Sequence, residues 1–378
     1  MARRYRGKRG QYKIMTGLLL LILVAGLVVG LVVFVLPDYL VTAEDGSVRV
    51  DIPFLRALWP SPSPVAEQPP AETFPFVEVT PTREVQTESP APSAPVSVLP
   101  KALWVPQEAL SEPERLAGLK QTALNSEINM LVLDMKNDEG LMPEAEVLQE
   151  AVLALKADGV EVVGRLSCLL DNTVTRQLAA VGVKHMSGVN WLDGEKNRWI
   201  NLHRPEALAY VVDCIQKAVD AGVDAVLLDN LHFPYEGRLD SIRYGEDADT
   251  PAAEALDALF DALPNSLPLY AVALPETLIE GKQEAAGQRF SRFDEVFAKL
   301  FVRIPAETAE EAFAEIVAGE GGASLEKIRL VPALRMPQDG GEEGLPVALR
   351  ALLGVAGGSK GYGYLVVDEQ GAYPEGLT

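Results

Sequence analysis

Beyond residue 99 the chain alternates short apolar runs with longer stretches that carry Ala, Leu and Glu at helical spacing. This alternation is typical of βα units, in which buried parallel strands are connected by surface helices. Helices are predicted at residues 144–157, 205–221 and 306–318, and each ends at or near a glycine, as helix ends prefer. Strands are predicted at residues 102–106, 130–136, 161–167, 225–230, 267–275, 299–305, 328–335 and 362–368.

Eight strands is the number that closes a TIM (β/α)8 barrel, and the length of residues 99–378 suits that fold. The alternative is an open doubly wound sheet, which needs a phosphate-binding glycine turn after an early strand. The glycine-rich stretch GGSKGYG lies late in the chain and precedes a strand, which is the wrong order for such a turn. The predicted fold class is therefore an α/β TIM barrel.

A second apolar pattern lies near the N-terminus, where residues 15–36 contain no charged side chain. A helix of this length can cross a hydrocarbon layer of roughly 30 Å, so a transmembrane helix is predicted. Six basic residues precede it and three acidic residues follow before Arg49, so the N-terminus is expected in the cytoplasm. A cleaved signal peptide is the alternative, but its apolar region is typically ~7–15 residues, and the longer run favours a signal anchor.

Residues 37–98 are predicted to be an extracytoplasmic linker, which is rich in proline from about residue 59. This composition lacks a sustained apolar period and is typical of a disordered spacer. Residues 46–58 could form a local strand or lie on the membrane surface. The predicted organisation is a basic cytoplasmic tip (1–14), a membrane helix (15–36), the linker and a barrel (99–378) in the extracellular space, anchored to the cell membrane by a single pass.

Charge and cysteine content narrow the choice of partners. Apart from the cytoplasmic tip, the chain carries 54 acidic and only 27 basic residues, which disfavours binding to nucleic acid. Neutral substrates such as sugars remain compatible with this charge. Cys168 and Cys214 are too few for a disulfide framework and have no metal-ligand spacing, so they are predicted to be buried thiols. No metal or cofactor is predicted.

Gly26 and Gly30 lie four residues apart within the predicted membrane helix. Small residues at this spacing let two membrane helices approach closely. Because small residues are common in such helices, weak dimerisation through Gly26 and Gly30 is the less favoured alternative.

Polar residues follow several predicted strands, and the active site of a TIM barrel lies at these carboxyl ends. Carboxylates from separate strands are therefore expected to converge on one mouth. The polar residues at or just beyond these ends are Asp134, Lys136 and Asp138 for the second strand, Arg165 for the third, Asp229 and His232 for the fourth, Glu276 for the fifth and Asp368 for the eighth.

The segments LVLDMKNDEG, VVGRLSCLLDN and the stretch from Arg198 to Pro234 resemble a bacterial family of glycoside hydrolase-like proteins with an α-amylase-like TIM barrel. That family shows D-x-K-x-D-x-G after strand two, Arg on strand three, Trp before the third helix and D-Y-x-R-F-P after strand four. The last motif differs here, because Asn230 replaces Tyr and His232 replaces Arg. The resemblance covers residues 102–244 and marks Asp134, Lys136, Asp138, Gly140, Arg165, Trp199, Asp229, Phe233 and Pro234.

The resemblance implies glycoside hydrolysis, which needs two carboxyl groups beside the scissile bond. Asp229 and Glu276 end neighbouring strands and are the predicted catalytic pair. The alternatives are that Asp229 neutralises Lys136 or Arg165, and that Glu276 only favours the start of the following helix. The substrate-binding residues are predicted to be Asp134, Lys136, Asp138, Arg165, Trp199, His232 and Asp368.

Asp134 and Lys136 alternate along one strand, so both are expected to face the barrel interior and to pair with each other.

The sequence therefore favours a membrane-anchored glycoside hydrolase that acts on an extracellular or cell-envelope glycan. One alternative is a catalytically degenerate barrel that binds carbohydrate or an envelope partner, and another is a rigid structural protein of the envelope. An enzyme needs two carboxylates that face one cavity, whereas a binding protein needs only a shaped pocket.

Overall fold

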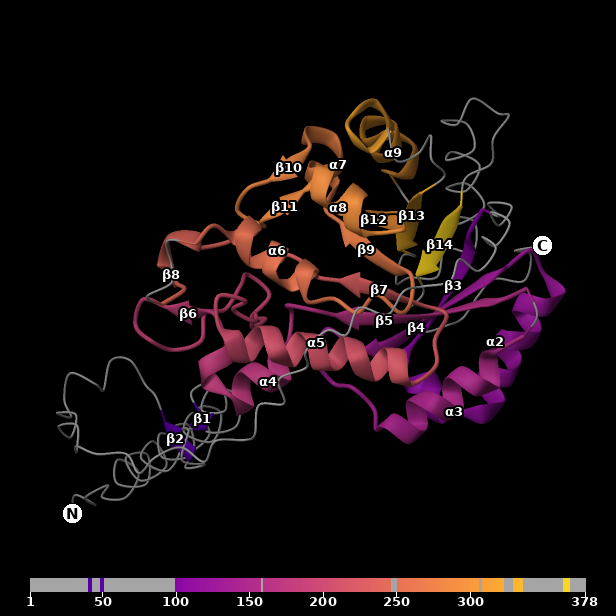
Figure 1. Cartoon of the computed structure of the whole chain (residues 1–378), viewed down its shortest axis with the longest axis horizontal. Coiled ribbons are helices and arrows are strands. Elements are labelled where there is room, and N and C mark those ends of the chain that lie inside the picture. Colours follow the sequence, from indigo (N-terminus) through magenta and orange to yellow (C-terminus); the bar gives the residue numbers. More distant parts are fainter. Residues whose placement is uncertain are drawn as a thin grey trace, which may run out of the picture.

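Eight parallel strands form a closed barrel in the computed structural model of the chain (Figure 1). The structure describes residues 40–42, 48–50, 99–157, 159–245, 250–305, 308–322, 329–335 and 363–367. The barrel strands are β3 (Lys101–Val105), β4 (Met130–Lys136), β5 (Glu161–Ser167), β7 (Ala225–Asp229), β9 (Leu269–Ala273), β12 (Lys299–Pro305), β13 (Leu330–Arg335) and β14 (Tyr364–Val367). They follow one another around the barrel in this order, and β14 pairs with β3 to close it.

Helices surround the barrel and also occupy its connections (Figure 1). The longer ones are α2 (Pro113–Asn125), α3 (Ala145–Leu155), α5 (Pro205–Asp220), α6 (Ala252–Asp261), α8 (Phe290–Val296) and α9 (Ala309–Ala318). Shorter elements are α4 (Asn172–Gln177), α7 (Pro275–Glu280), η4 (Gln107–Ser111), η5 (Ala179–Val181) and η6 (Leu239–Ser241). Three antiparallel pairs join β1 (Leu40–Thr42) to β2 (Val48–Val50), β6 (Lys184–His185) to β8 (Ile242–Arg243), and β10 (Lys282–Gln283) to β11 (Gln288–Arg289).

All eight predicted strands are confirmed, with ends that differ by at most two residues. The β2 strand shows that residues 46–58 include a local strand, which was one of the two predictions for this segment. Within the described ranges, no helix is long and apolar enough to cross a membrane. The predicted membrane helix at residues 15–36 and the proline-rich stretch up to residue 98 lie outside those ranges.

Each barrel strand contributes to two apolar cores, because side chains alternate between the two faces of a strand. In β4, Met130 and Val132 belong to the core inside the barrel, whereas Leu131 and Leu133 belong to the core between barrel and helices. Burial on both faces explains why these strands read as nearly continuous apolar runs.

Helix α5 shows how the outer core is built from sequence. It begins at Pro205, where a missing N–H costs nothing, and it ends before Gly222, whose φ of 87° suits a helix end. Its buried residues recur every three or four positions and pack towards β5 and β7. They are Ala207, Val211, Cys214, Ile215 and Ala218.

Polar groups fill the amino end of the barrel interior. The Tyr270 hydroxyl donates to Glu161, and Lys299 Nζ donates to the Tyr270 oxygen at 2.6 Å.

The long connections leave from the opposite, carboxyl end of the barrel. Residues 168–204 follow β5 and include α4, η5 and β6, and β6 pairs with β8 from the connection after β7.

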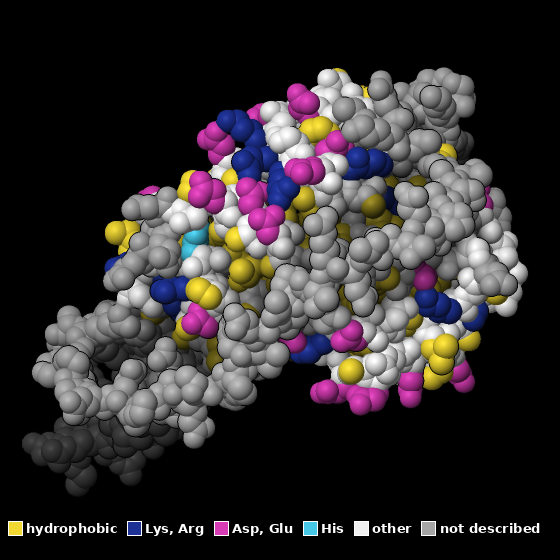
Figure 2. Space-filling view, in the orientation of Figure 1, with side chains coloured by type: hydrophobic (Ala, Val, Ile, Leu, Met, Phe, Trp, Pro, Cys, Tyr) yellow, Lys and Arg dark blue, Asp and Glu magenta, His cyan; other side chains and the backbone are white. Residues whose placement is uncertain are grey.

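The surface is charged, and both signs mix over α6 and α8 (Figure 2). There Arg292 lies within 3.3 Å of Asp257 and 2.7 Å of Asp261. Acidic side chains dominate the edge over α3 in the same view. The overall acidity read from the sequence therefore does not spread evenly over the face shown.

Candidate active site

A cavity of about 330 Å³ opens at the carboxyl ends of the barrel strands. Every strand of the barrel contributes at least one residue to its wall. Side chains of the inner core, Leu227, Phe301 and Leu365, form an apolar floor. The charged residues that line the cavity are Glu108, Asp134, Asp138, Glu139, Arg165, Asp229, Arg303 and Arg335.

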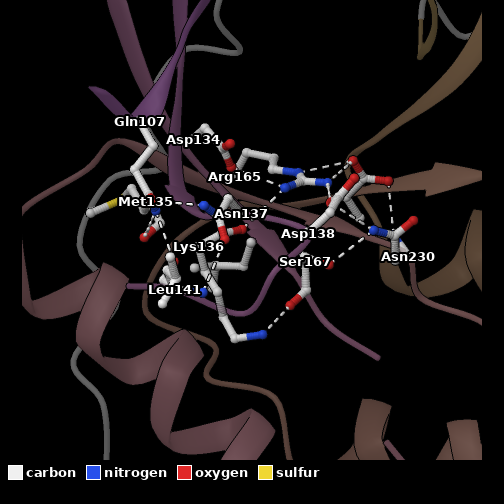
Figure 3. A network of polar contacts seen from close by, with 12 residues as sticks. Gln107, Asp134, Met135, Lys136, Asn137, Asp138, Leu141, Arg165, Ser167 and Asn230 are labelled. Atoms are coloured by element: carbon white, nitrogen blue, oxygen red, sulfur yellow. Dashed lines mark hydrogen bonds and ion pairs between the residues drawn. The ribbon is translucent and has the colours of Figure 1, made fainter. Parts of the chain in front are cut away.

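Arg165 on β5 lies at the centre of this charged wall, with only 1% of its surface exposed (Figure 3). Its Nη1 donates to Asp134 Oδ1 at 2.9 Å, its Nη2 donates to Asp138 Oδ1, and its Nε and Nη2 donate to Asp229 Oδ2 at 2.9 and 2.7 Å. A guanidinium carries five N–H donors in a rigid plane, so it can hold three carboxylates at once. One buried cation thus gathers acids from β4, its loop and β7.

The carboxylates keep Arg165 charged in this buried position. Burial alone would lower the pKa of the guanidinium, but Asp229, Asp138 and Asp134 together raise it well above its ordinary value. The guanidinium also lies 5.4 Å from the ring centre of Trp104 on β3, which is within the range of a cation–π contact. Arg165 is therefore fixed from below by an aromatic ring and from the sides by acids.

Asp229 at the end of β7 has both carboxylate oxygens engaged. Its Oδ2 accepts hydrogen bonds from Arg165 and from Arg303 Nη2, and its Oδ1 accepts the backbone N–H of Asn230 at 2.8 Å. Burial opposes ionisation, but the two arginines outweigh it and hold the pKa of Asp229 well below its ordinary range. Asp229 is therefore an ionised carboxylate at any pH near neutrality.

Asn230 connects three strand ends. Its φ of 47° lies in the left-handed region, which asparagine tolerates better than most residues. In this conformation its Nδ2 donates to Asp138 Oδ1 and to Ser167 Oγ, both at 2.9 Å (Figure 3). The Asn230 side chain therefore ties the loop after β4 to the ends of β5 and β7.

Asp134 and Asp138 share Arg165, yet their acidities differ. The Asp134 side chain is 13% exposed, and burial raises its pKa to about 6 despite the Arg165 contact. The Asp138 side chain is 49% exposed; burial still opposes its ionisation, but Arg165 and Arg303 outweigh this and lower its pKa. The cavity thus contains one carboxyl that titrates near neutrality beside two that stay ionised.

Lys136 does not pair with Asp134, so that prediction is wrong. The register between β4 and β5 shifts between Asp134 and Lys136, which marks a β-bulge at Met135. The bulge turns Lys136 out of the barrel towards α5. There Lys136 Nζ lies 2.8 Å from Asp171 Oδ2 and donates to the Ser167 carbonyl at 2.7 Å.

Gly140 closes the D-x-K-x-D-x-G motif for a steric reason. Its φ is 81°, and a Cβ at this position would lie 1.9 Å from Asp171 Oδ1. Asp171 also accepts the Val174 N–H and the Tyr210 hydroxyl, at 2.7 and 2.8 Å. The glycine therefore leaves room for the buried acid that neutralises Lys136.

Trp199 and His232 are buried together and do not line the cavity. Their rings lie 5.0 Å apart, and the Trp199 indole donates to Asp193 Oδ2 at 3.0 Å. Burial lowers the pKa of His232 to about 4, so the ring is neutral near pH 7. Their geometry indicates packing beneath the loops, and neither reaches the mouth in this structure.

Glu276, the predicted partner of Asp229, lies apart from the cavity lining. The strand β9 ends at Ala273 and α7 begins at Pro275, so Glu276 falls on the first turn of a helix, where its side chain is exposed. This position fits the alternative of a helix-start charge. Asp368, the other predicted acid, lies outside the described residues.

Arg303 and Trp104 were missed as site residues. Arg303 lies two positions after Phe301 and Trp104 two after Ala102, so strict alternation from the inner-core residues would have placed both in the mouth. Arg303 supplies a second guanidinium to Asp229, whereas position 232, an arginine in the family motif, is here a buried histidine.

The arrangement can stabilise positive charge and exchange protons. An ionised carboxylate such as Asp229 suits an oxocarbenium-like centre, and a carboxyl with a raised pKa suits proton transfer. Within the described ranges, no group of three or more His, Cys, Asp or Glu side chains is arranged to hold a metal ion.

Comparison with protein families gives a match over part of the barrel. Residues 102–275 match the family described as "Putative glycosyl hydrolase domain". The resemblance predicted from the motifs is therefore confirmed, and the match extends from β3 to the start of α7. Comparison with curated proteins gives no match.

Several solved structures are distantly similar to the barrel. A hypothetical protein from Ruminiclostridium thermocellum is 21% identical, with 45% of this chain and 96% of that chain covered and a TM-score of 0.40. The glycoside hydrolase domain of PelA from Pseudomonas aeruginosa is 12% identical, with 72% and 95% covered and a TM-score of 0.45. The α-galactosidase from Lactobacillus brevis is 12% identical, with 74% and 38% covered and a TM-score of 0.47.

Proposed function

We propose, from the family match and the charged mouth of the barrel, that this chain is a membrane-anchored glycoside hydrolase acting on an extracellular or cell-envelope glycan. The observation that supports this most is the convergence of three carboxylates on Arg165 inside one cavity. A binding site for a neutral sugar does not require three acids around a buried cation. Glycoside hydrolysis does require carboxyl groups on both sides of the scissile bond.

Asp229 is the proposed carboxylate that faces the anomeric carbon. It comes from the carboxyl end of β7, where TIM barrels place catalytic groups, and it matches the first position of the family's strand-four motif. Its low pKa keeps it negative, which is the state needed to stabilise the developing positive charge. The cavity volume of about 330 Å³ lies within the range of small-molecule sites.

The test compares the full-length protein with its Asp229→Asn variant on a panel of envelope and dietary glycans. We expect the wild type to release reducing sugar from at least one glycan, and the variant to lose at least about 100-fold of that rate, because an amide bears no negative charge. Glu280→Gln, at an exposed site on α7 outside the cavity, is the matched control and should keep the wild-type rate. Circular dichroism spectra must show that Asp229→Asn is folded.

A second candidate function is glycan binding without hydrolysis. The observation that favours it is that the hydrogen-bonding capacity of Asp229 is already used. Its Oδ2 accepts from two arginines, so the carboxylate is held as their counter-ion. In that case the wild type binds a glycan but releases no sugar. Asp229→Asn would then change the affinity by ~1–3 kcal/mol, as expected for one buried polar contact.

The anchoring part of the proposal depends on residues 15–36 and their flanking charges. An uncleaved signal anchor with its basic end in the cytoplasm would hold the barrel outside the cell. The proline-rich stretch from about residue 59 would then set the distance from the membrane at which glycans are reached.

A further inference from the structure

Among the three carboxyl groups on Arg165, Asp134 has the least engaged side chain. Its Oδ1 accepts from Arg165 Nη1 at 2.9 Å, and no donor within the described residues contacts its Oδ2. It nevertheless lies in a largely buried position on the cavity wall. A carboxyl that keeps one oxygen anchored and the other unbonded can carry a proton on the second oxygen.

The other two carboxyls are less suited to hold a proton. Asp229 accepts hydrogen bonds on both oxygens, including contacts from Arg165 and Arg303. Asp138 accepts from Arg165 and Asn230 on one oxygen, and half of its side chain is exposed to water. Donors and water both favour the charged form, so these two groups remain anions.

The charges around Asp134 come from several elements. Arg165 on β5 favours its ionised form, whereas Asp138 in the following loop and Asp229 on β7 oppose it. The cavity also exposes it to Arg303 on β12 and Arg335 on β13, and to Glu108 and Glu139 at the rim. Burial is the largest influence and brings the pKa of Asp134 to about 6. Acid and base forms of Asp134 are therefore both accessible near neutral pH.

We infer that Asp134 is the catalytic acid that protonates the leaving oxygen during glycoside hydrolysis in this mouth. This inference rests on the proposed function and names Asp134, in place of Glu276, as the second catalytic carboxyl group. The exposed position of Glu276 on α7, outside the cavity lining, disfavours that earlier assignment. Two carboxyls whose pKa values are pushed apart by their surroundings are the usual signature of an acid and its ionised partner.

The proposed step balances as follows. The bond between the anomeric carbon and the leaving oxygen breaks, and the leaving oxygen takes the proton from Asp134. A water molecule supplies the hydroxyl group that bonds to the anomeric carbon, and the remaining proton of that water restores the protonated Asp134 through solvent. Asp229 stays negative and stabilises the positive charge that develops at the anomeric carbon.

The test uses two substrates of the same sugar, once the glycan panel has identified it. One is the natural glycan, whose sugar leaving group needs a proton. The other is a nitrophenyl glycoside, whose leaving group departs readily as an anion. We expect Asp134→Asn to lose ~100-fold or more on the glycan but less than about 10-fold on the nitrophenyl glycoside. Asp229→Asn should lose both activities to a similar extent.

The pH dependence provides a second readout. In the wild type, kcat/KM for the glycan should fall as pH rises through about 6, because Asp134 loses its proton. The pH–rate profile of Asp134→Asn should lack this decrease, and the profile of Asp134→Glu should retain it with a changed midpoint. If Asp134 had only a structural role, its replacement would lower the rate at all pH values without removing the decrease.

Each outcome separates the inference from the proposed function. If the wild type cleaves both substrates but Asp134→Asn loses both activities equally, Asp134 is not the catalytic acid, although the protein is still a hydrolase. The same conclusion follows if Glu276→Gln, rather than Asp134→Asn, loses activity on the glycan selectively. If the folded wild type cleaves neither substrate, the proposed function fails and the inference fails with it. Thermal unfolding of each variant confirms that its activity is measured on folded protein.

Discussion

Aspartates in this barrel differ in acidity because their neighbours differ. Asp229 is held by two arginines and a backbone N–H, so its charged form is stabilised despite burial. Asp134 has one arginine contact and two acidic neighbours, so burial prevails and its pKa rises. The same residue type, on neighbouring sides of one guanidinium, thus supplies both an anion and a group able to donate protons.

The raised pKa of Asp134 has a consequence for stability. With a folded-state pKa of about 6 against an ordinary value of 3.8, the folded protein binds the extra proton between these values. The associated stabilisation is complete below pH ~4 and is lost as pH rises through about 6, by up to about 3 kcal/mol. Asp134→Asn should therefore gain stability relative to the wild type between pH 4 and pH 7 in urea unfolding.

Asp138→Asn is a control whose stability, relative to the wild type, should change with pH in the opposite direction. Because the pKa of Asp138 is lowered, its stabilisation is present at neutral pH and lost in acid, so this variant should lose stability relative to the wild type as pH rises. A pH-independent difference for Asp134→Asn would contradict the raised pKa.

Lys136 provides a prediction about a buried ion pair. Both Lys136 and Asp171 are at most 1% exposed, so Lys136→Met would leave Asp171 as an uncompensated buried charge. We expect a loss of ~3–5 kcal/mol in the free energy of unfolding. Lys217→Met, which removes an exposed pair with Asp213 on α5, should cost less than about 1 kcal/mol.

Chemical denaturation of both variants measures the difference. Adding Asp171→Asn to Lys136→Met should recover part of the loss, because the buried charge is removed. Equal costs for Lys136→Met and Lys217→Met would show that the buried pair is not strongly coupled.

At the site, sequence reasoning placed some residues correctly and misplaced others for identifiable reasons. Asp229 and Arg165 were expected at the mouth, and they contact each other there. Lys136 was misplaced because a bulge is invisible to simple alternation. Glu276 was expected at a strand end, but that strand stops earlier and Pro275 starts a helix instead.

The elements of the barrel were easier to predict than its connections. A parallel strand is buried on both faces, so its sequence is an apolar run that stands out from the helices. The long excursion after β5 was not predicted, because α4 and β6 are very short and are held by contacts with distant segments. Local sequence carries little information about such pairings.

Closure between β14 and β3 yields an element-scale prediction. Gly363 precedes β14, and a Cβ there would lie 2.6 Å from the Pro100 carbonyl oxygen. Tyr364 N donates to that same oxygen at 2.7 Å, so a bulkier residue would disturb the first bond of the closing pair. We expect Gly363→Ala to lower the free energy of unfolding by ~1–3 kcal/mol.

Gly118 provides the matched glycine control for this change. It lies within α2 and has no atom within 4 Å of an added Cβ. Gly118→Ala should therefore stabilise the protein by ~0.5–1 kcal/mol, as expected in a helix interior. A melting temperature of Gly363→Ala equal to that of the wild type would argue that the closing strand tolerates displacement.

At the scale of the whole molecule, the proposed tether predicts a protease-sensitive topology. Protease added to intact cells should release a soluble fragment that begins between residues 59 and 100, because an exposed proline-rich linker is the accessible part. N-terminal sequencing of the released fragment identifies the cut. An epitope tag on the basic tip should stay protected until the cells are opened. Recovery of only full-length protein from accessible cells would contradict this orientation.

The bulge at Met135 gives the wall of the barrel an unusual sensitivity to chain length. One extra residue sends Asp134 into the mouth and Lys136 to the opposite side of the same wall. Deleting Met135 would remove the extra residue, and regular alternation would then place Lys136 directly after Asp134 and still on the helix side of the wall. The loop that follows the strand would be drawn back by one residue. Asp138, whose carboxylate contacts Arg165 from that loop, would move away from the mouth. The number of residues in this strand thus sets how far an acidic group reaches over the cavity.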